Sequence, residues 1–196
     1  MPDFQIHPLT PDRWDDFVDL FGPERGANSG CWCMWWRMLR TDWEAMPRDE
    51  KRDRFRAVVE AGPPPGVLAY TGDGAVGWCA IGPRPMLPSM NASPVAAPFE
   101  AVEGVWAVNC FYIRSGYRRQ GLMRVLLDGA VSFAAGQGAA IVEACPIETD
   151  RKLMWGEGYV GVAPVFREAG FKEVARRSPT RPLMRLRIGT AQALAS

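Results

Sequence analysis

Hydrophobic and polar residues along this chain follow two different spacings, which divide it into helices and strands. Apolar residues recur three and four positions apart in stretches that predict helices at residues 11–21, 47–60, 121–136 and 162–169. Short apolar runs bounded by glycine, proline or charged residues predict strands at residues 4–7, 67–71, 75–81, 105–113, 139–145, 171–176 and 183–188. The pattern therefore predicts an α/β fold with the element order β-α-α-β-β-β-α-β-α-β-β.

Local patterns add detail to several of these elements. Thr10 followed by Pro11 is typical of a helix cap and a first helical position, and Gly72-Asp73-Gly74 is typical of a hairpin turn. The strand at 105–113 does not alternate, so we expect it to be buried on both faces. Residues 82–103 form a long, proline-rich stretch, which predicts a loop or lid.

Composition and charge then narrow the class of protein. The 196 residues fit a single domain, and 47% hydrophobic with 23% charged residues is typical of a soluble globular protein. A net charge of +1 gives no general electrostatic reason to expect nucleic acid or an anionic membrane as a partner. No apolar run approaches about 18 residues and the N-terminus lacks a signal-peptide pattern, so we expect a cytoplasmic protein.

The five cysteines do not indicate a disulfide framework, because their number is odd and the chain is long. Cys31 and Cys33 are close in sequence, but the single histidine, His7, and the lack of a C-x-x-C pair leave a zinc site without ligands. We therefore expect Cys31 and Cys33 to be reduced and free of metal. Cys110 and Cys145 lie in apolar strands, where buried structural cysteine is expected.

A basic, glycine-containing turn separates the strand at 105–113 from the helix at 121–136. It contains Gly116, Arg118, Arg119 and Gly121. The first N–H groups of a helix have no partner within it and the helix dipole is positive there, so this position stabilises an anion. Arginine side chains add charge-assisted donors. No Walker or dinucleotide glycine motif occurs in the chain, which argues against those classes of nucleotide-binding protein.

The segment Arg118-Arg119-Gln120-Gly121-Leu122-Met123 resembles the [RQ]-x-x-G-x-[GA] pyrophosphate loop of GNAT-superfamily N-acetyltransferases. Met123 departs from the glycine or alanine that is usual there. The element order over nearly the whole chain is also similar to that fold. The resemblance implies a GNAT-type mixed central sheet flanked by helices, with acetyl-CoA as co-substrate and no metal.

The resemblance also implies a domain plan. A single domain is expected over 1–188, with 1–62 as a helical acceptor-side part, 64–188 as the sheet and CoA-binding core, and 189–196 as a disordered tail. The implied acceptor is an amine on a small molecule or a peptide. Whether the protein forms a homodimer is left open. Neither nucleic acid nor a membrane is expected as a partner.

Cofactor-binding residues are implied by the resemblance along the strand and the turn. They are Phe111, Tyr112, Ile113, Arg118, Arg119, Gln120, Gly121, Leu122 and Met123. In the family, a bulge in the strand before the loop directs a backbone N–H at the thioester oxygen, and Asn109, Cys110 and Phe111 occupy that stretch here.

A second segment, residues 165–171, resembles the family pattern Y-x-x-x-G-F, but the tyrosine position holds Phe166. In many members that tyrosine is proposed to protonate the departing thiolate. Phe166 cannot do so, and another group must supply the proton.

Candidate catalytic side chains are few. Asn109 could hold a water, and Glu103 and Glu143 are carboxylates beside or within the central strands, where a strand-end or solvated charge is the alternative reading. Tyr159 could replace the missing phenol, although an ordinary half-buried tyrosine and a water donor are alternatives. Trp32, Trp35 and Trp36 form, with Trp43, either an aromatic wall for the acceptor or a packing segment for the first helices.

Two functions fit these patterns. The first is an N-acetyltransferase that moves an acetyl group from acetyl-CoA to an amine by direct attack. The second is an acyl-CoA-binding regulatory or sensor module with little turnover, which would be consistent with Phe166 and the few carboxylates.

Overall fold

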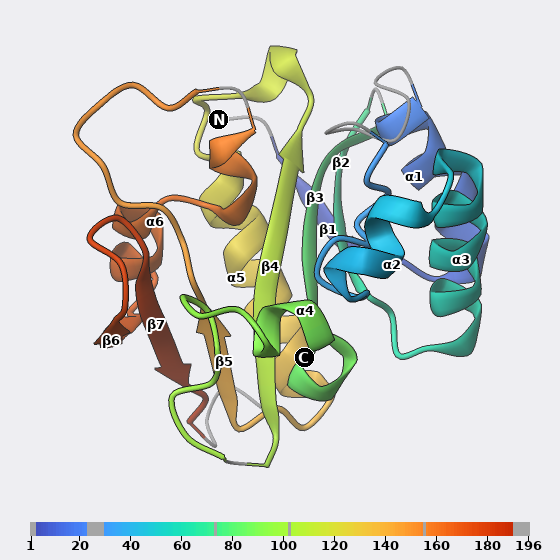
Figure 1. Ribbon diagram of the computed structural model, residues 1–196. Helices are drawn as coiled ribbons and strands as arrows, with labels where there is room; N and C mark the ends of the chain where they lie inside the picture. Colours follow the sequence, from blue (N-terminus) through green and yellow to red (C-terminus); the bar gives the residue numbers. More distant parts are fainter. Residues whose placement is uncertain (1–2, 23–29, 73, 102, 155, 190–196) are drawn as a thin grey trace.

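A computed structural model describes residues 3–22, 30–72, 74–101, 103–154 and 156–189, and Figure 1 shows its arrangement. The strands are β1 (Gln5–Pro8), β2 (Gly66–Thr71), β3 (Gly74–Pro83), β4 (Val105–Ile113), β5 (Ile141–Ala144), β6 (Lys172–Arg176) and β7 (Pro182–Arg187). The helices are α1 (Trp14–Phe21), α2 (Arg40–Ala45), α3 (Arg48–Ala61), α4 (Pro88–Asn91), α5 (Leu122–Gly136) and α6 (Ala163–Glu168).

All seven strands form one mixed sheet in the order β1-β2-β3-β4-β5-β7-β6. The pair β4 and β5 is parallel and the other neighbours are antiparallel. The expected mixed α/β fold is confirmed, and the predicted elements lie within about two residues of those observed. Strand β4 is buried almost throughout, as its lack of alternation predicts.

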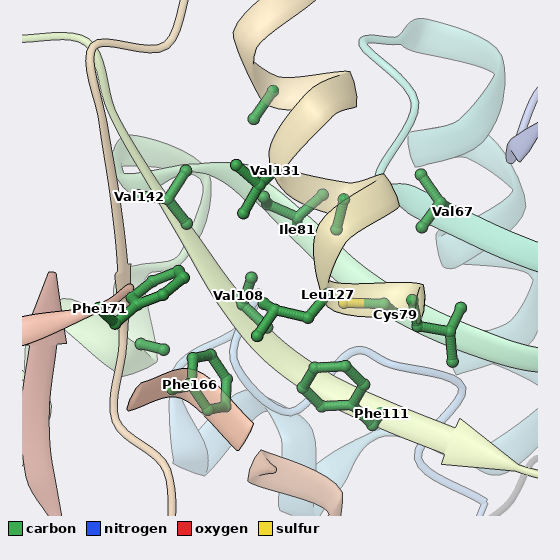
Figure 2. Close-up of a cluster of buried hydrophobic side chains, with 14 of the residues drawn as sticks. Val67, Cys79, Ile81, Val108, Phe111, Leu127, Val131, Val142, Phe166 and Phe171 are labelled. Carbon is green, nitrogen blue, oxygen red and sulfur yellow. The ribbon is translucent and has the colours of Figure 1, made fainter. Parts of the chain in front are cut away.

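Helices cover both faces of the sheet (Figure 1), because alternate residues of the central strands point to opposite sides. Cys79 and Ile81 of β3 pack with the apolar stripe of α5 on one face. Trp78 and Ala80 of the same strand pack with α1, α3 and residues 32–38 on the other. The sheet therefore separates two hydrophobic clusters, and Figure 2 shows part of the first.

The structure differs from the sequence expectation in three places. Helix α2 was not predicted, and the proline-rich stretch expected to be a loop contains α4 and a 3-10 turn, Arg84–Met86. Thr10 precedes a 3-10 turn that leads into α1, and its hydroxyl accepts a bond from Arg13 at 2.9 Å instead of capping the backbone. Asp73 of the predicted hairpin and residues 190–196 of the expected tail lie outside the described residues.

Candidate active site

The basic turn after β4 has the geometry of an anion-binding loop. A 3-10 turn, Ser115–Tyr117, follows the strand, and α5 begins after Gly121. The φ angle of Gly121 is +80° and that of Arg119 is +62°, so these two residues, one on each side of Gln120, lie in the left-handed region. Such a conformation directs successive N–H groups to one side, and the first N–H groups of the 15-residue helix α5 add to them.

Side chains brace this loop from within. Arg118 Nε donates to the carbonyl of Ile113 at 2.8 Å, and Gln120 Nε2 donates to the carbonyl of Gly116 at 2.8 Å. The first bond ties the loop to the end of β4, and the second ties it to the 3-10 turn. Gln120 therefore acts within the loop, and it does not line the cavity beside it.

A cavity of about 620 Å³, called here the loop cavity, opens beside the basic turn. Its walls come from the end of β4, the turn, the first residues of α5 and the segment between β5 and α6. The residues lining it that were expected to bind the cofactor are Phe111, Ile113, Arg118, Arg119, Gly121, Leu122 and Met123. The cavity is also lined by Arg124, Leu153 and Val162, which no motif in the sequence marks.

Tyr112, also expected to bind the cofactor, lies on the opposite face of β4 from the loop cavity. Neighbouring residues of a strand point to opposite faces, so Phe111 and Ile113 face the loop cavity while Tyr112 faces the other way. Tyr112 lines a second cavity of about 590 Å³, called here the aromatic cavity. The side chains in its wall include Phe21, Trp35, Trp36, Trp43, Asn109 and Tyr159.

The tryptophans of the N-terminal segment divide between two roles. Trp35 and Trp36 line the aromatic cavity, and Trp43 lies edge-on to Trp35 with ring centroids 4.9 Å apart. Trp32 is only 6% exposed and packs against Phe17 and Phe21 in the core. Trp32 is therefore a packing residue, while the acceptor-wall role stays a prediction for Trp35 and Trp36, which line a cavity.

The two cavities meet where β4 and β5 separate. Pairing between these parallel strands ends at Val108 and Ala144, while β4 continues to Ile113. Opposite β3, the register shifts between Ala80, which faces Cys110, and Ile81, which faces Val108. Asn109 is therefore the extra residue of a β-bulge, at the position the resemblance led us to expect.

Tyr159 and Gly156 line both cavities and so mark the junction between them. Tyr159 lies in a 3-10 turn, Glu157–Val160, and its ring is nearly parallel to that of Tyr112 with centroids 6.3 Å apart. Asn109 is 4% exposed and lines the aromatic cavity, and its Nδ2 has no hydrogen-bond partner among the described residues. The structure thus brings Asn109 and Tyr159, two of the four candidate catalytic residues, to this region.

The other two candidates, the carboxylates of Glu103 and Glu143, lie elsewhere. Glu103 is exposed before the first residue of β4 and lines neither cavity, so the geometry gives it no catalytic part. Glu143 is fully buried between Arg84 and Arg185, whose NH2 atoms lie 2.6 and 2.7 Å from its oxygens. The proline-rich segment that carries Arg84 is held by this network and contributes no described residue to either cavity wall.

Phe166, at the tyrosine position of the second motif, lies in the core. It is fully buried, and Figure 2 shows its ring between Phe111 and Phe171. The centroid distances are 6.1 Å to Phe111 and 5.1 Å to Phe171, both with edge-on geometry. A phenol is therefore supplied at the junction by Tyr159 from the preceding turn, and not by this position of α6.

Within the described residues, no group of three or more histidine, cysteine, aspartate or glutamate side chains is placed to hold a metal ion. No helix in that part of the chain has both the length and the apolar character needed to cross a membrane.

Comparisons with known proteins agree with this geometry. The model of the acetyltransferase (GNAT) family matches residues 32–154, which is more than half of the chain. No curated protein gives a significant match. Among solved structures, a GNAT-family protein from Desulfovibrio desulfuricans matches with a TM-score of 0.53 and 17% identity, covering 95% of this chain and all of the other.

Two further structures show the same fold. The PaiA N-acetyltransferase of Thermoplasma acidophilum, solved with coenzyme A, has a TM-score of 0.52 and 9% identity, over 95% of this chain and 99% of the other. The ribosomal-protein-S18-alanine N-acetyltransferase of Escherichia coli has a TM-score of 0.51 and 12% identity, over 96% of both chains. Together with the family match, the loop at a helix start, the bulged strand and the separated strands lead to one conclusion: the chain belongs to the GNAT acetyltransferase family.

Proposed function

We propose that this protein transfers an acetyl group from acetyl-CoA to an amine by direct attack at the junction of the two cavities. The observation that carries the proposal is the position of Tyr159, which lines the loop cavity and the aromatic cavity together. A donor held on one side and an acceptor held on the other would meet beside this phenol and beside the bulge at Asn109.

The loop cavity fits the phosphates of a coenzyme. Its polar end has the left-handed backbone at Arg119 and Gly121, the start of α5 and the side chains of Arg118, Arg119 and Arg124. These groups offer N–H donors and positive charge, which anions require. Apolar residues such as Phe111, Ile113 and Leu153 line the rest and suit an uncharged arm. Bound acetyl-CoA would supply the activated thioester.

The chain's own contribution to the transfer starts with the bulge. A bulged strand leaves a backbone group unpaired, and one preorganised N–H directed at a developing oxyanion typically contributes about 3 kcal/mol. The phenol of Tyr159 is the proposed donor of a proton to the departing thiolate, with water as the alternative. Asn109 would hold a water or the acceptor through its Nδ2.

The state of the amine sets a further requirement. An amine with a pKa near 10.4 is neutral only about once in 2500 at pH 7, which corresponds to about 4.6 kcal/mol. Among the described residues that line the cavities, the carboxylates are Glu157, which is paired with Arg151, and Glu168. With no unpaired carboxylate in the described wall of the aromatic cavity, the proposal favours an amine of lower pKa or deprotonation through water.

The same shortage of bases favours a second candidate, an acyl-CoA-binding sensor or regulatory module with little turnover. One experiment separates the two. Acetyl-CoA binding is measured by calorimetry, and CoA release is then followed with a panel of small-molecule and peptide amines. Binding with amine-dependent release supports the transferase. Binding with release no faster than thioester hydrolysis supports the module, and absence of binding contradicts both. A cytoplasmic location is part of the same proposal.

A further inference from the structure

Three thiols lie in the wall of the aromatic cavity, and the proposed transfer uses none of them. Cys31 and Cys33 come from the segment after α1, and Cys110 comes from β4 beside the bulge. All five cysteines of the chain are free in the structure. The other two, Cys79 and Cys145, are buried and line neither cavity.

The backbone holds Cys33 in an unusual conformation. Trp32 has a φ of +45° and Cys33 a φ of +57°, so two consecutive residues that are not glycine occupy the left-handed region. This region is strained for residues that carry a Cβ. Core packing holds the backbone there, since the Trp32 ring packs against Phe17 and Phe21. The turn fixes the Cys33 side chain between the sheet and the cavity.

The Cys33 sulfur accepts a hydrogen bond from the sheet, since the indole Nε1 of Trp78 donates to Cys33 Sγ at 3.0 Å. Cys110 packs in the same cluster and lines the same cavity wall as Cys33, and its own thiol donates to the carbonyl of Phe111 at 3.8 Å. The guanidinium of Arg37 lies close enough for its charge to act on Cys33. An indole N–H can only donate, so the Cys33 sulfur is the acceptor, a part that a thiolate fills better than a thiol.

The pKa values of the three thiols are shifted in different directions by their surroundings. Burial by itself would raise the pKa of Cys33, but the neighbouring Cys110 thiol, the Trp78 N–H and the charge of Arg37 lower it below its ordinary value. The neighbouring Cys33 and burial raise the pKa of Cys110 well above the ordinary range. Burial and the neighbouring Cys33 raise the pKa of Cys31 to about 11. Of the three thiols, Cys33 therefore loses its proton most readily, and Cys110 keeps its proton beside it.

We propose that Cys33 and Cys110 form an oxidation site for small hydroperoxides, which closes into a disulfide across the wall of the aromatic cavity. The Cys33 thiolate attacks one oxygen of hydrogen peroxide, so that an S–O bond forms, the O–O bond breaks and hydroxide leaves. The Cys110 thiol then attacks the sulfenic sulfur, the S–O bond breaks and water leaves. Two electrons pass from the two thiols to one peroxide.

The disulfide would affect acetyl transfer because Cys110 lies next to the bulge at Asn109. A covalent bond there ties the segment of Trp35 and Trp36 to the strand at the junction, so the acceptor can no longer enter freely. Oxidation would thus inhibit acetyl transfer reversibly, and a thiol reductant would restore it. The dithiol site itself does not depend on the proposed function, whereas its effect on turnover does.

The test begins with chemistry that needs no acceptor. The full-length protein is treated with stoichiometric hydrogen peroxide, alkylated and mapped by peptide mass spectrometry. The expected product is a peptide pair linked through Cys33 and Cys110, with a mass loss of two hydrogens and full reversal by dithiothreitol. A bond from Cys31 to either residue, or no bond at all, would overturn the pairing.

Variants separate the two roles and guard against misfolding. In Cys110→Ala, Cys33 keeps the hydrogen bond from Trp78 and should accumulate as a sulfenic acid that dimedone labels, at least ten times faster than Cys145 in the same sample. Cys79→Ala is the control and should form the same disulfide as the unmodified sequence. Dimedone on Cys31 instead of Cys33 contradicts the assignment.

The effect on turnover is measured last, with an amine shown to be acetylated. The oxidised protein should lose at least tenfold in turnover and recover it with dithiothreitol, while Cys110→Ala should be resistant. A fully linked protein that turns over normally would overturn the regulatory role. Absence of turnover before oxidation would instead contradict the proposed function and leave the mapped disulfide as the deciding result for the dithiol site.

Discussion

At the scale of single residues, Gly121 shows how one backbone angle serves a binding site. Its φ of +80° lies where residues with a Cβ are strained by roughly 1–2 kcal/mol, and a Cβ there would meet no atom within 4 Å. The requirement for glycine is therefore conformational. Space beside the residue is left for a ligand.

We predict that Gly121→Ala weakens acetyl-CoA binding at least tenfold by calorimetry, because the loop must change shape to relieve the strain. Gly116→Ala is the matched control. Gly116 lies in the same turn without a left-handed φ, its Cβ would also meet open space, and it does not line the loop cavity. Affinity within twofold of wild type for both variants would contradict the placement of the phosphates. Arg119→Ala, which removes one contact, should have the smaller effect.

Tyr159 carries the second prediction at this scale. If its phenol donates the proton to the departing thiolate, Tyr159→Phe should lower kcat by roughly 10²–10⁴-fold and leave acetyl-CoA affinity nearly unchanged. Single-turnover kinetics and calorimetry give the two values. Phe166→Tyr should not rescue this variant, because Phe166 is fully buried against Phe111 and Phe171 and lines neither cavity. Unchanged kcat in Tyr159→Phe would assign the proton to water.

At the scale of elements, the segment between α1 and α2 combines packing and binding. Trp35→Leu or Trp36→Leu should raise the acceptor KM severalfold without changing acetyl-CoA affinity, because these rings line only the aromatic cavity. Trp32→Leu is the control, and it should lower the free energy of unfolding by about 2 kcal/mol or more through lost core contacts. If all three variants lose stability and keep the acceptor KM, the whole segment is structural.

Glu148, which follows β5, links α6 to β6. Hydrogen bonds from Arg167 and Arg176 hold the pKa of Glu148 at about 2, below its ordinary value near 4.5. A depressed carboxyl pKa adds stability that is present above the ordinary value and is lost as pH falls through the folded value. We predict that the free energy of unfolding falls as the pH is lowered from about 4.5 to about 2. Glu148→Gln should make this dependence on pH less steep. Chemical denaturation of both proteins at several pH values in this range measures the difference. Equal slopes would contradict this role.

At the scale of the whole molecule, the cluster of Arg84, Glu143 and Arg185 joins three distant parts of the chain. Each arginine is 5% exposed, and both donate to the fully buried carboxylate of Glu143. Removing one partner of a buried ion pair leaves an uncompensated charge, which typically costs 3–5 kcal/mol.

Glu143→Ala should therefore lower the free energy of unfolding by roughly 3–5 kcal/mol in urea, with acetyl-CoA affinity retained while the protein stays folded. Glu60→Ala provides the control. Its carboxylate pairs with Arg56 at 3.0 Å on an exposed helix face, where such pairs are worth about 0.5 kcal/mol or less. A similar small cost for both variants would show that the buried cluster adds little to stability.

Local sequence determined most of the helices and strands and the basic loop of the site. Strands and long helices follow from spacing because side-chain period decides which face is buried, and the loop at Gly121 follows from glycine and basic residues at a helix start. Helix α2 escaped the pattern because none of its residues is buried, and α4 escaped it because four residues are too few to repeat it.

Tertiary structure alone decided which side chains meet. Neighbouring residues Phe111 and Tyr112 lie in different cavities, and Trp32 lies in the core while Trp35 reaches a cavity. Glu143 is neutralised by two arginines from distant segments. Tyr159 reaches the junction from a 3-10 turn, which no periodic spacing of hydrophobic residues predicts. These outcomes depend on where β4 and β5 stop pairing and where Asn109 bulges, which are set by contacts between distant segments that no local pattern encodes.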